Sequence, residues 1–254
     1  MKKLIILGVP FSVLTPEEAI DLLADWVIGT KNHIVVTPNP EGVMQAKRNN
    51  QFANAIKDAD LTLADGTGIY LASIIYGNRL PGRVRGIDTA FGLFDKLAKI
   101  NKPVTAYFLG GRPKTVEKPS VAEIAAKNME NKYPNLKVIG CHDGYYTESD
   151  EMCIVDNINK LCPDILLVCL GMPKAEIFAH KQRHINAKIT MCLGGTIDVM
   201  AGEVKLAPGF LRKIGFEWLY RLVKQPNRFF RMIDLPKFVA AVLWERFIRR
   251  YCKK

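Results

Sequence analysis

The chain has 254 residues and a formal net charge of +11, from 36 Lys plus Arg and 25 Asp plus Glu. With 48% hydrophobic and 24% charged residues, its composition excludes disordered, collagen-like and low-complexity proteins and predicts a buried core. The charge is concentrated at one end, because residues 205–254 hold 13 basic and three acidic side chains, a local +10. We therefore expect an α/β body at residues 1–204 and a basic appendage at residues 205–254.

The cysteines and the N-terminus both bear on cellular location. The six cysteines have no C-x-x-C spacing and lie mostly in apolar runs, so we expect reduced, core-filling thiols and a cytosolic protein. Two lysines and an apolar run open the chain, as in a signal peptide, but Pro10 and Ser12 interrupt the run and no small-residue cleavage pattern follows. No window reaches the roughly 18 apolar residues of a spanning helix, so any membrane contact is expected to be peripheral.

Short aliphatic runs alternate with amphipathic segments of helical length. The predicted strands cover residues 4–7, 33–37, 61–64, 104–110, 136–140, 164–170 and 188–194. The predicted helices cover residues 16–28, 41–57, 66–77, 88–100, 120–132, 148–161 and 174–184. This alternation predicts an α/β protein whose mostly parallel sheet is covered by helices on both faces. Ligands of such sheets bind outside the carboxyl ends of the strands, so we expect the chemistry in the segments that follow the strands.

Those segments are polar and rich in glycine. They read TPNPEG, DGTG, GGRPK, GMPK and GGTID, and they include Gly110, Gly171 and Gly194. Glycine lets a backbone approach a ligand closely, and helix N-termini offer N–H groups to anionic oxygens, so a nucleoside diphosphate fits these loops. Strand-to-helix turns also need glycine, but five such loops together favour a phosphate site. The absence of G-x-G-x-x-G after the first strand and of G-x-x-x-x-G-K-[ST] argues against dinucleotide oxidoreductases and P-loop NTPases.

Asp65 and the loop from Thr37 to Asn39 follow two predicted strands and could act together on a sugar. Asp65 could serve as the N-cap of the next helix or as a general base at the carboxyl end of the sheet. Thr37 and Asn39 could present a hydroxyl and an amide beside it, in a loop stiffened by Pro38 and Pro40. Asn39 could equally cap a proline-rich turn. The D-G-T-G at Asp65 has no second copy, which argues against an aspartic protease.

Two patterns that bind metal in other proteins are interpreted here as surface features. Asp58 and Asp60 form a D-x-D, which holds divalent ions in many sugar transferases, but they precede a strand and are expected on the far side of the sheet. His180 and His184 lie four residues apart without the Glu of a zinc protease motif, which favours a solvated helix face. We therefore expect no metal and no other cofactor.

The last fifty residues combine basic and aromatic side chains. They hold ten of the 23 aromatic residues, interleaved with arginines and interrupted by Pro226 and Pro236. This pattern is typical of helices that lie in a membrane interface, with rings among the headgroups and arginines on anionic lipid. The alternative is a helical pair that packs its aromatics on the body. Nucleic-acid binding is not expected, because no known motif is present and bulky aliphatics share the basic surface.

Seven segments, in chain order, carry a resemblance to a known family. They are TPNPEGVMQAKRN, LTLADGTGIYLAS, RVRGID, FLGGRP, GMPKAEIF, GGTIDVMAGEVKLAP and EWLYRLVKQPNRFFR. Over nearly its whole length the chain resembles the WecG/TagA/CpsF family of bacterial glycosyltransferases, and within it the TagA branch of wall teichoic acid synthesis. The resemblance implies a Rossmann-like body that acts in cell-wall biogenesis, peripherally, on the cytoplasmic face of the plasma membrane. It also implies inverting transfer of N-acetylmannosamine from its UDP donor to the C4 hydroxyl of undecaprenyl-diphosphate-linked N-acetylglucosamine.

The family's site residues transfer motif by motif. The family's catalytic base, threonine and asparagine correspond to Asp65, Thr37 and Asn39. Its two charged donor-pocket positions correspond to Arg83 and Asp198. Its three tail arginines correspond to Arg221, Arg228 and Arg231. The resemblance implies that the tail arginines close over the site and meet the acceptor's diphosphate. Ala175 and Leu206 stand where many members have Gln and Arg, so N-acetylmannosaminuronic acid or another UDP-hexosamine is an alternative donor. The alternative from another functional class is a non-catalytic, nucleotide-binding membrane adaptor. Separately, the chain could form a homo-oligomer.

Overall fold

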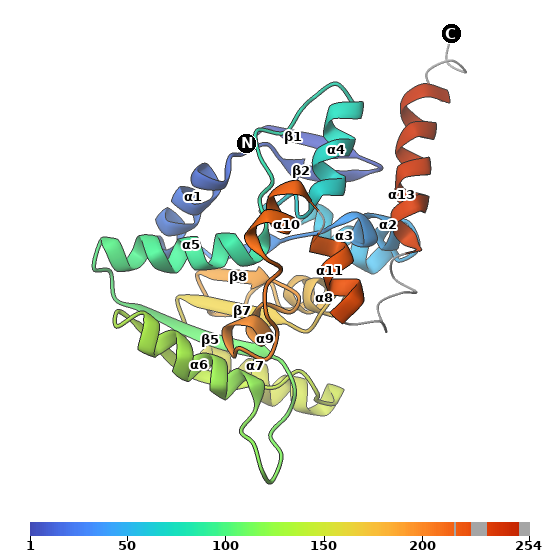
Figure 1. Ribbon diagram of the computed structural model, residues 1–254. Coiled ribbons are helices and arrows are strands. Elements are labelled where there is room, and N and C mark those ends of the chain that lie inside the picture. Colours follow the sequence, from blue (N-terminus) through green and yellow to red (C-terminus); the bar gives the residue numbers. More distant parts are fainter. Residues whose placement is uncertain (216, 225–232, 249–254) are drawn as a thin grey trace.

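The computed structural model describes residues 1–215, 217–224 and 233–248 (Figure 1). Its centre is a six-stranded sheet in which every neighbouring pair is parallel. In spatial order the strands are β4 (Leu61–Thr62), β3 (His33–Val36), β8 (Ile189–Cys192), β7 (Ile165–Cys169), β5 (Val104–Gly110) and β6 (Leu136–His142). The predicted α/β fold with a Rossmann-like, mostly parallel sheet is therefore confirmed.

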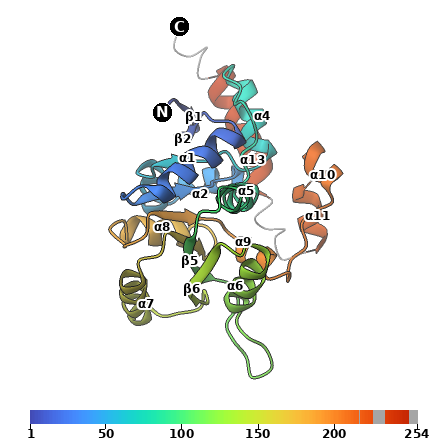
Figure 2. The same cartoon turned by 90° about the vertical axis from the view of Figure 1, so that its left-hand side faces the viewer.

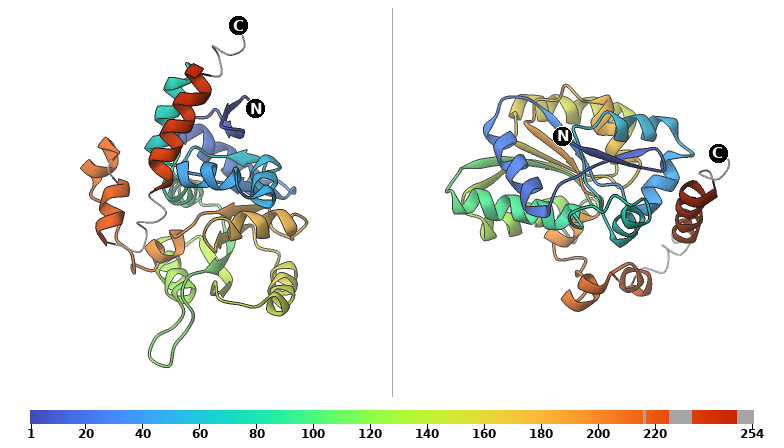
Figure 3. Two further views of the ribbon diagram at one scale, coloured as in Figure 1. Left: turned by 90° about the vertical axis from the view of Figure 1, so that its right-hand side faces the viewer. Right: turned by 90° about the horizontal axis from the view of Figure 1, so that it is seen from above.

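Helices cover both faces of this sheet, and each face has its own buried apolar cluster. One cluster lies under α1 (Pro16–Ile28), α5 (Gly86–Lys99), α6 (Val121–Lys132) and α9 (Thr196–Met200). The other lies under α2 (Pro40–Ala46), α3 (Asn50–Lys57), α4 (Thr67–Ile75), α7 (Glu148–Leu161) and α8 (Lys174–Lys181). Figure 3, on the right, shows the sheet seen from above between these layers. Because both faces are covered, only the ends and edges of the strands remain for a ligand.

Local sequence explains where several helices begin. α1, α6 and α7 each start with a capping box, in which an N-cap hydroxyl accepts from a backbone N–H and an acidic side chain three residues later accepts from the cap. The boundaries predicted for these three helices agree with the structure to within one residue.

Two predicted elements differ from the observed ones. Residues 4–7 do yield a strand, β1 (Lys3–Ile6), but it pairs antiparallel with β2 (Val9–Ser12) in a separate two-stranded sheet. The turn between them places Leu7 and Gly8 at positive φ (49° and 87°), the backbone of a tight hairpin. The helix predicted over 41–57 is two helices, because the Asn49 side chain caps α3 by accepting from the Phe52 N–H at 3.1 Å.

The cysteines follow the prediction only in part. Cys169 and Cys192 are buried, as expected for core-filling thiols, whereas Cys153 and Cys162 are exposed. Burial raises the pKa of the Cys169 thiol to about 12 and that of Cys192 well above its usual value.

The C-terminal part contains α10 (Gly209–Ile214), α11 (Glu217–Lys224), α13 (Asp234–Leu243) and the short π-helix η2 (Trp244–Ile248). α13 lies beside α2 and α4 and buries Phe238 and Val242 in the core (Figure 3, left). α10 and α11 lie together to one side of the body (Figure 2). None of the helices in the described ranges is long and apolar enough to cross a membrane.

Candidate active site

A cleft of about 1020 Å³ lies at the carboxyl ends of β4, β3, β8 and β7. Its walls also include residues of α4, of the start of α5, and of the C-terminal helices α10, α11 and α13. Seven residues predicted from the sequence line this one cleft: Thr37, Asn39, Asp65, Arg83, Gly171, Gly194 and Asp198. The strand order thus gathers side chains that are up to 161 positions apart in the chain.

The remaining predicted residues are placed differently. Gly110 is not among the residues that line the cleft. A Cβ at this position would lie 2.5 Å from the carbonyl oxygen of Cys169, so the glycine is required by close packing of β5 on β7. Arg221 belongs to α11, but its side chain lies outside the described residues, as do Arg228 and Arg231 entirely.

Thr37 is held rigidly at the end of β3. Its side chain is buried, and its hydroxyl donates to the carbonyl oxygen of Cys192 on the adjacent strand at 3.0 Å. Gly86, at the start of α5, packs against it so closely that a Cβ there would lie 2.9 Å from the Thr37 methyl carbon. Because the hydroxyl proton is used within the fold, the Thr37 oxygen meets a ligand as an acceptor.

Asn39 is the N-cap of α2. Its Oδ1 accepts from the backbone N–H of Gly42 at 2.9 Å, which is the capping role that the sequence left open. The cap fixes the plane of the amide, and Nδ2 is then the group with which Asn39 can bind a ligand. Capping and ligand binding are therefore compatible at this residue.

Asp65 stands between β4 and α4, half-buried in the cleft wall. The N-cap of α4 is Gly66, which has φ of 89° and no side chain to cap with. Asp65 therefore precedes the cap position, and the alternative in which it is only the N-cap of this helix is not what the structure has. A carboxylate at the carboxyl end of an outer strand, beside a hydroxyl and an amide, can accept a proton from a bound hydroxyl.

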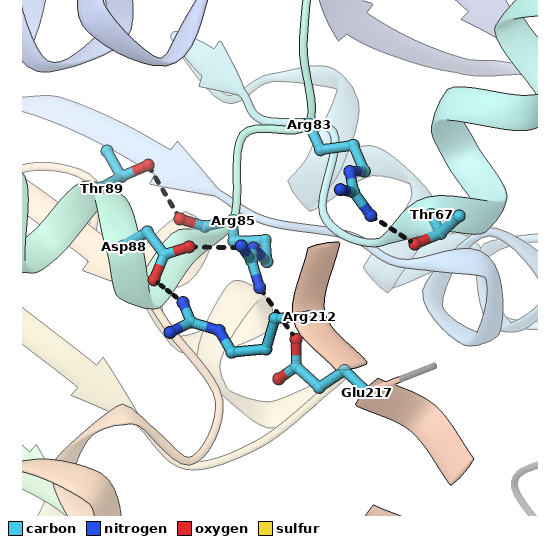
Figure 4. Close-up of polar contacts among 7 residues, drawn as sticks. All are labelled: Thr67, Arg83, Arg85, Asp88, Thr89, Arg212 and Glu217. Atoms are coloured by element: carbon cyan, nitrogen blue, oxygen red, sulfur yellow. Dashed lines mark hydrogen bonds and ion pairs between the residues drawn. The ribbon is translucent and has the colours of Figure 1, made fainter. Parts of the chain in front are cut away.

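An arginine cluster faces the same cleft from the α5 side (Figure 4). Arg83 donates from Nη1 to the Thr67 hydroxyl at 3.1 Å. Arg85 forms ion pairs with Asp88 (Nε–Oδ2, 2.9 Å) and with Glu217 of α11 (Nη1–Oε2, 3.2 Å). Arg212 of α10 pairs with the other oxygen of Asp88. Cations in this arrangement can stabilise an anionic leaving group.

The lining residues that were not predicted from the sequence include Arg85, Arg212 and Glu176. Arg85 is the second arginine of the RVRGID segment, and Arg212 is one of many tail cations, so neither had a distinguishing signal. Glu176 lies in the first turn of α8 and is only 2% exposed. Burial raises its pKa to about 7.

The D-x-D lies away from this cleft. Asp58 pairs with Nε2 of His180 at 2.9 Å, and Asp60 accepts from the Ile34 N–H at 2.8 Å, at the amino ends of β4 and β3. Neither aspartate lines the cleft. Within the described ranges, no group of three or more His, Cys, Asp or Glu residues is placed to hold a metal ion. Metal independence itself stays a prediction.

The fold and the cleft together define a class of protein. A parallel sheet whose strand ends bring a carboxylate, a hydroxyl, an amide and arginines into one cavity is typical of α/β enzymes that act on phosphate-linked substrates.

Comparison with known proteins gives the family. Residues 4–251 match the model of the glycosyl transferase WecG/TagA/CpsF family, and the chain belongs to this family. Three relatives carry the name N-acetylglucosaminyldiphosphoundecaprenol N-acetyl-beta-D-mannosaminyltransferase. The one from Bacillus spizizenii is 36% identical over 84% of this chain and 79% of its own length. Those from Bacillus subtilis and Staphylococcus aureus (strain MRSA252) are 34% and 32% identical, over 89% and 94% of this chain and 85% and 92% of theirs.

Proposed function

We propose that this glycosyltransferase moves N-acetylmannosamine from UDP-N-acetylmannosamine to the C4 hydroxyl of undecaprenyl-diphosphate-linked N-acetylglucosamine, a step of wall teichoic acid synthesis. The names of the relatives support the acceptor and the transferred sugar. The observation that carries the proposal is that Asp65, Thr37 and Asn39 line one cleft together with the arginine cluster. A donor diphosphate and an acceptor hydroxyl need these two kinds of group at the same place.

The proposed reaction is a single displacement. Asp65 takes the proton of the acceptor's 4-hydroxyl as its oxygen forms the bond to C1 of the donor sugar, and the bond from C1 to the phosphate oxygen breaks on the opposite side. UDP leaves with the bonding electron pair, so the configuration at C1 inverts. Asn39 and Thr37 orient hydroxyl groups beside Asp65, and Arg83 and Arg85 stabilise the departing diphosphate.

Membrane attachment is the second part of the proposal. Trp244 and Phe247 of η2 are 62% and 53% exposed, and Val239 on α13 is 50% exposed. Large apolar side chains exposed next to a strongly basic tail favour peripheral binding to an anionic bilayer on the inner face of the plasma membrane. The lipid-linked acceptor would then reach the cleft from the membrane, since α13 also lines the cleft.

The test is a turnover assay with a panel of UDP sugars and a short-chain lipid diphosphate acceptor. We expect UDP-N-acetylmannosamine to be used at least about tenfold faster than its N-acetylglucosamine, N-acetylgalactosamine and N-acetylmannosaminuronic acid counterparts. Proton NMR of the product should show that the anomeric configuration is inverted. Preference for the uronic acid would assign the chain to another polysaccharide, and binding of UDP without any turnover would favour the nucleotide-binding adaptor.

A further inference from the structure

Glu176 is a buried acidic residue to which the proposed reaction assigns no role. It occupies the third position of α8, lines the cleft, and is 2% exposed. Its Oε2 has no hydrogen-bond partner among the described residues. A buried polar atom without a partner is rare in folded proteins, and in a ligand cleft the missing partner is expected on the ligand.

No ion pair stabilises Glu176 within the described part of the chain. α8 packs on β3, β7, β8 and α3, whose titratable residues are His33, Cys169, Cys192, Lys57 and the neighbouring Asp58. None of the ion pairs found among the described residues includes Glu176. Burial, and to a smaller extent the charge of Glu176, raises the pKa of the Cys192 thiol well above its usual value, so this thiol is neutral.

The protonation of Glu176 determines what it can bind. Burial raises its pKa to about 7, so near neutral pH a large share of the carboxyl is uncharged. An uncharged carboxyl offers one O–H donor and one carbonyl acceptor, which suits a hydroxyl or an amide. A phosphate oxygen does not suit this position, because its negative charge would be repelled by the carboxylate form of Glu176.

The two sides of the cleft are therefore chemically different. Arg85 reaches it from the start of α5, which covers one face of the sheet, whereas Glu176 reaches it from α8, which covers the other face. Thr37 is linked to the Glu176 side by two hydrogen bonds. It donates to the carbonyl oxygen of Cys192, and the Cys192 thiol donates at 3.4 Å to the carbonyl oxygen of Ala175, the residue before Glu176. A diphosphate fits the arginine side, and the uncharged ring attached to it fits the Glu176 side, next to Thr37.

We propose that Glu176 hydrogen-bonds an uncharged polar group of the donor sugar, a hydroxyl or the acetamido group, and so helps to select the sugar. This inference rests on the proposed function in one respect, that the donor is a UDP sugar. It assigns Glu176 to substrate binding and leaves the proton transfer to Asp65.

The test is calorimetric binding of UDP and of UDP-N-acetylmannosamine to the full chain and to Glu176→Gln, Glu176→Leu and Glu176→Ala. Leucine fills the space without a polar group, alanine repeats the test with a smaller side chain, and glutamine keeps a donor and an acceptor. We expect Leu and Ala to weaken the UDP sugar about tenfold and Gln to weaken it about threefold or less, with UDP affinity unchanged in all three. Glu123, which holds the same third position in α6 away from the cleft, gives the control Glu123→Gln, and it should change neither affinity.

The outcomes separate this inference from the proposed function. If the Leu and Ala variants bind the UDP sugar as tightly as the parent, or lose UDP and the UDP sugar equally, Glu176 does not contact the sugar. The same conclusion follows if the sugar adds nothing to the parent's affinity for UDP. Failure of the proposed function is seen elsewhere, as absence of turnover by the parent with every UDP sugar of the panel. Melting temperatures of the three variants show whether any loss of binding comes from misfolding.

Discussion

Arg85 and Glu217 form an ion pair between the start of α5 and the start of α11, with Nη1 and Oε2 3.2 Å apart and the residues 132 positions apart in the chain. Both side chains are mostly buried, at 21% and 18% exposure. Arg85 also pairs with Asp88, and Asp88 pairs with Arg212 of α10 (Figure 4). This network connects the two helices α10 and α11 to the body at the edge of the cleft.

The first prediction is that Glu217→Gln loosens α11. A partly buried ion pair of this kind contributes about 1 kcal/mol, so opening of α11 should become roughly fivefold more frequent. Hydrogen exchange of the α11 amides measures this directly. Glu203→Gln is the matched control, because Glu203 pairs with Arg112 at the same 3.2 Å. Equal exchange in the Glu217 variant and the parent would mean that other contacts hold α11.

The second prediction concerns the general base. Asp65→Asn should lower turnover at least about a hundredfold, because an amide cannot accept the acceptor's proton. UDP affinity and melting temperature should change little, since the amide has nearly the shape of the carboxyl and the N-cap of α4 is Gly66. Steady-state kinetics and calorimetry give these quantities separately. Turnover close to that of the parent would remove Asp65 from the mechanism.

The third prediction is that turnover survives thorough chelation with EDTA. The arginine cluster can stabilise the leaving diphosphate, and Asp58 and Asp60 interact with His180 and Ile34 away from the cleft. Asp58→Asn should likewise leave the rate unchanged within about twofold. Loss of activity that Mg²⁺ or Mn²⁺ restores would show that a metal takes part after all.

The sequence predicts the fold well because short apolar runs for strands and amphipathic segments for helices are local patterns. It also predicts which loops meet, since the carboxyl ends of parallel strands share one edge. It could not predict that β1 lies outside the main sheet, because the hairpin that pairs β1 with β2 depends on the positive φ angles of Leu7 and Gly8. Nor could it single out Arg85 or Glu176. Arg85 is distinguished by an ion pair with a residue that is distant in the chain, and Glu176 by a buried oxygen without a partner. The residue pattern around these positions indicates neither feature.

The fourth prediction concerns pH and the attachment of α13. Arg48 donates to both carboxylate oxygens of Asp234, at 3.0 and 2.5 Å, and these hydrogen bonds lower the pKa of Asp234. A lowered pKa means that the pair stabilises the fold above the ordinary value of about 3.9 and stops doing so as the pH falls through the lowered value. Asp234→Asn should therefore melt about 2 °C below the parent at pH 6, and the difference should shrink towards zero as the pH falls below the lowered pKa of Asp234. A difference that persists at low pH would assign the stabilisation to another contact.

The last prediction concerns membrane binding, and the structure determines how it must be tested. Phe238 and Val242 of α13 are buried in the core, so deleting residues from about 205 onward would uncover apolar surface of the body as well as remove the anchor. Substituting the exposed residues Trp244 and Phe247 avoids this problem. Full burial of one aromatic side chain contributes about 1.5–3 kcal/mol, so partial insertion of two rings predicts at least about a tenfold loss of affinity for vesicles in the double serine variant.

The matched control is Tyr145→Ser, because Tyr145 is 75% exposed in the loop between β6 and α7, away from α13. Sedimentation with vesicles of mixed anionic and zwitterionic lipid measures the affinity of each variant. For the parent, the affinity should fall as salt shortens the Debye length without reaching zero, because ring insertion is less sensitive to salt than the attraction of basic residues to the lipid. Turnover of a water-soluble acceptor should be unchanged in the double variant. Unchanged vesicle binding would show that these rings do not enter the bilayer, and loss of soluble turnover would show that η2 contributes to the cleft itself.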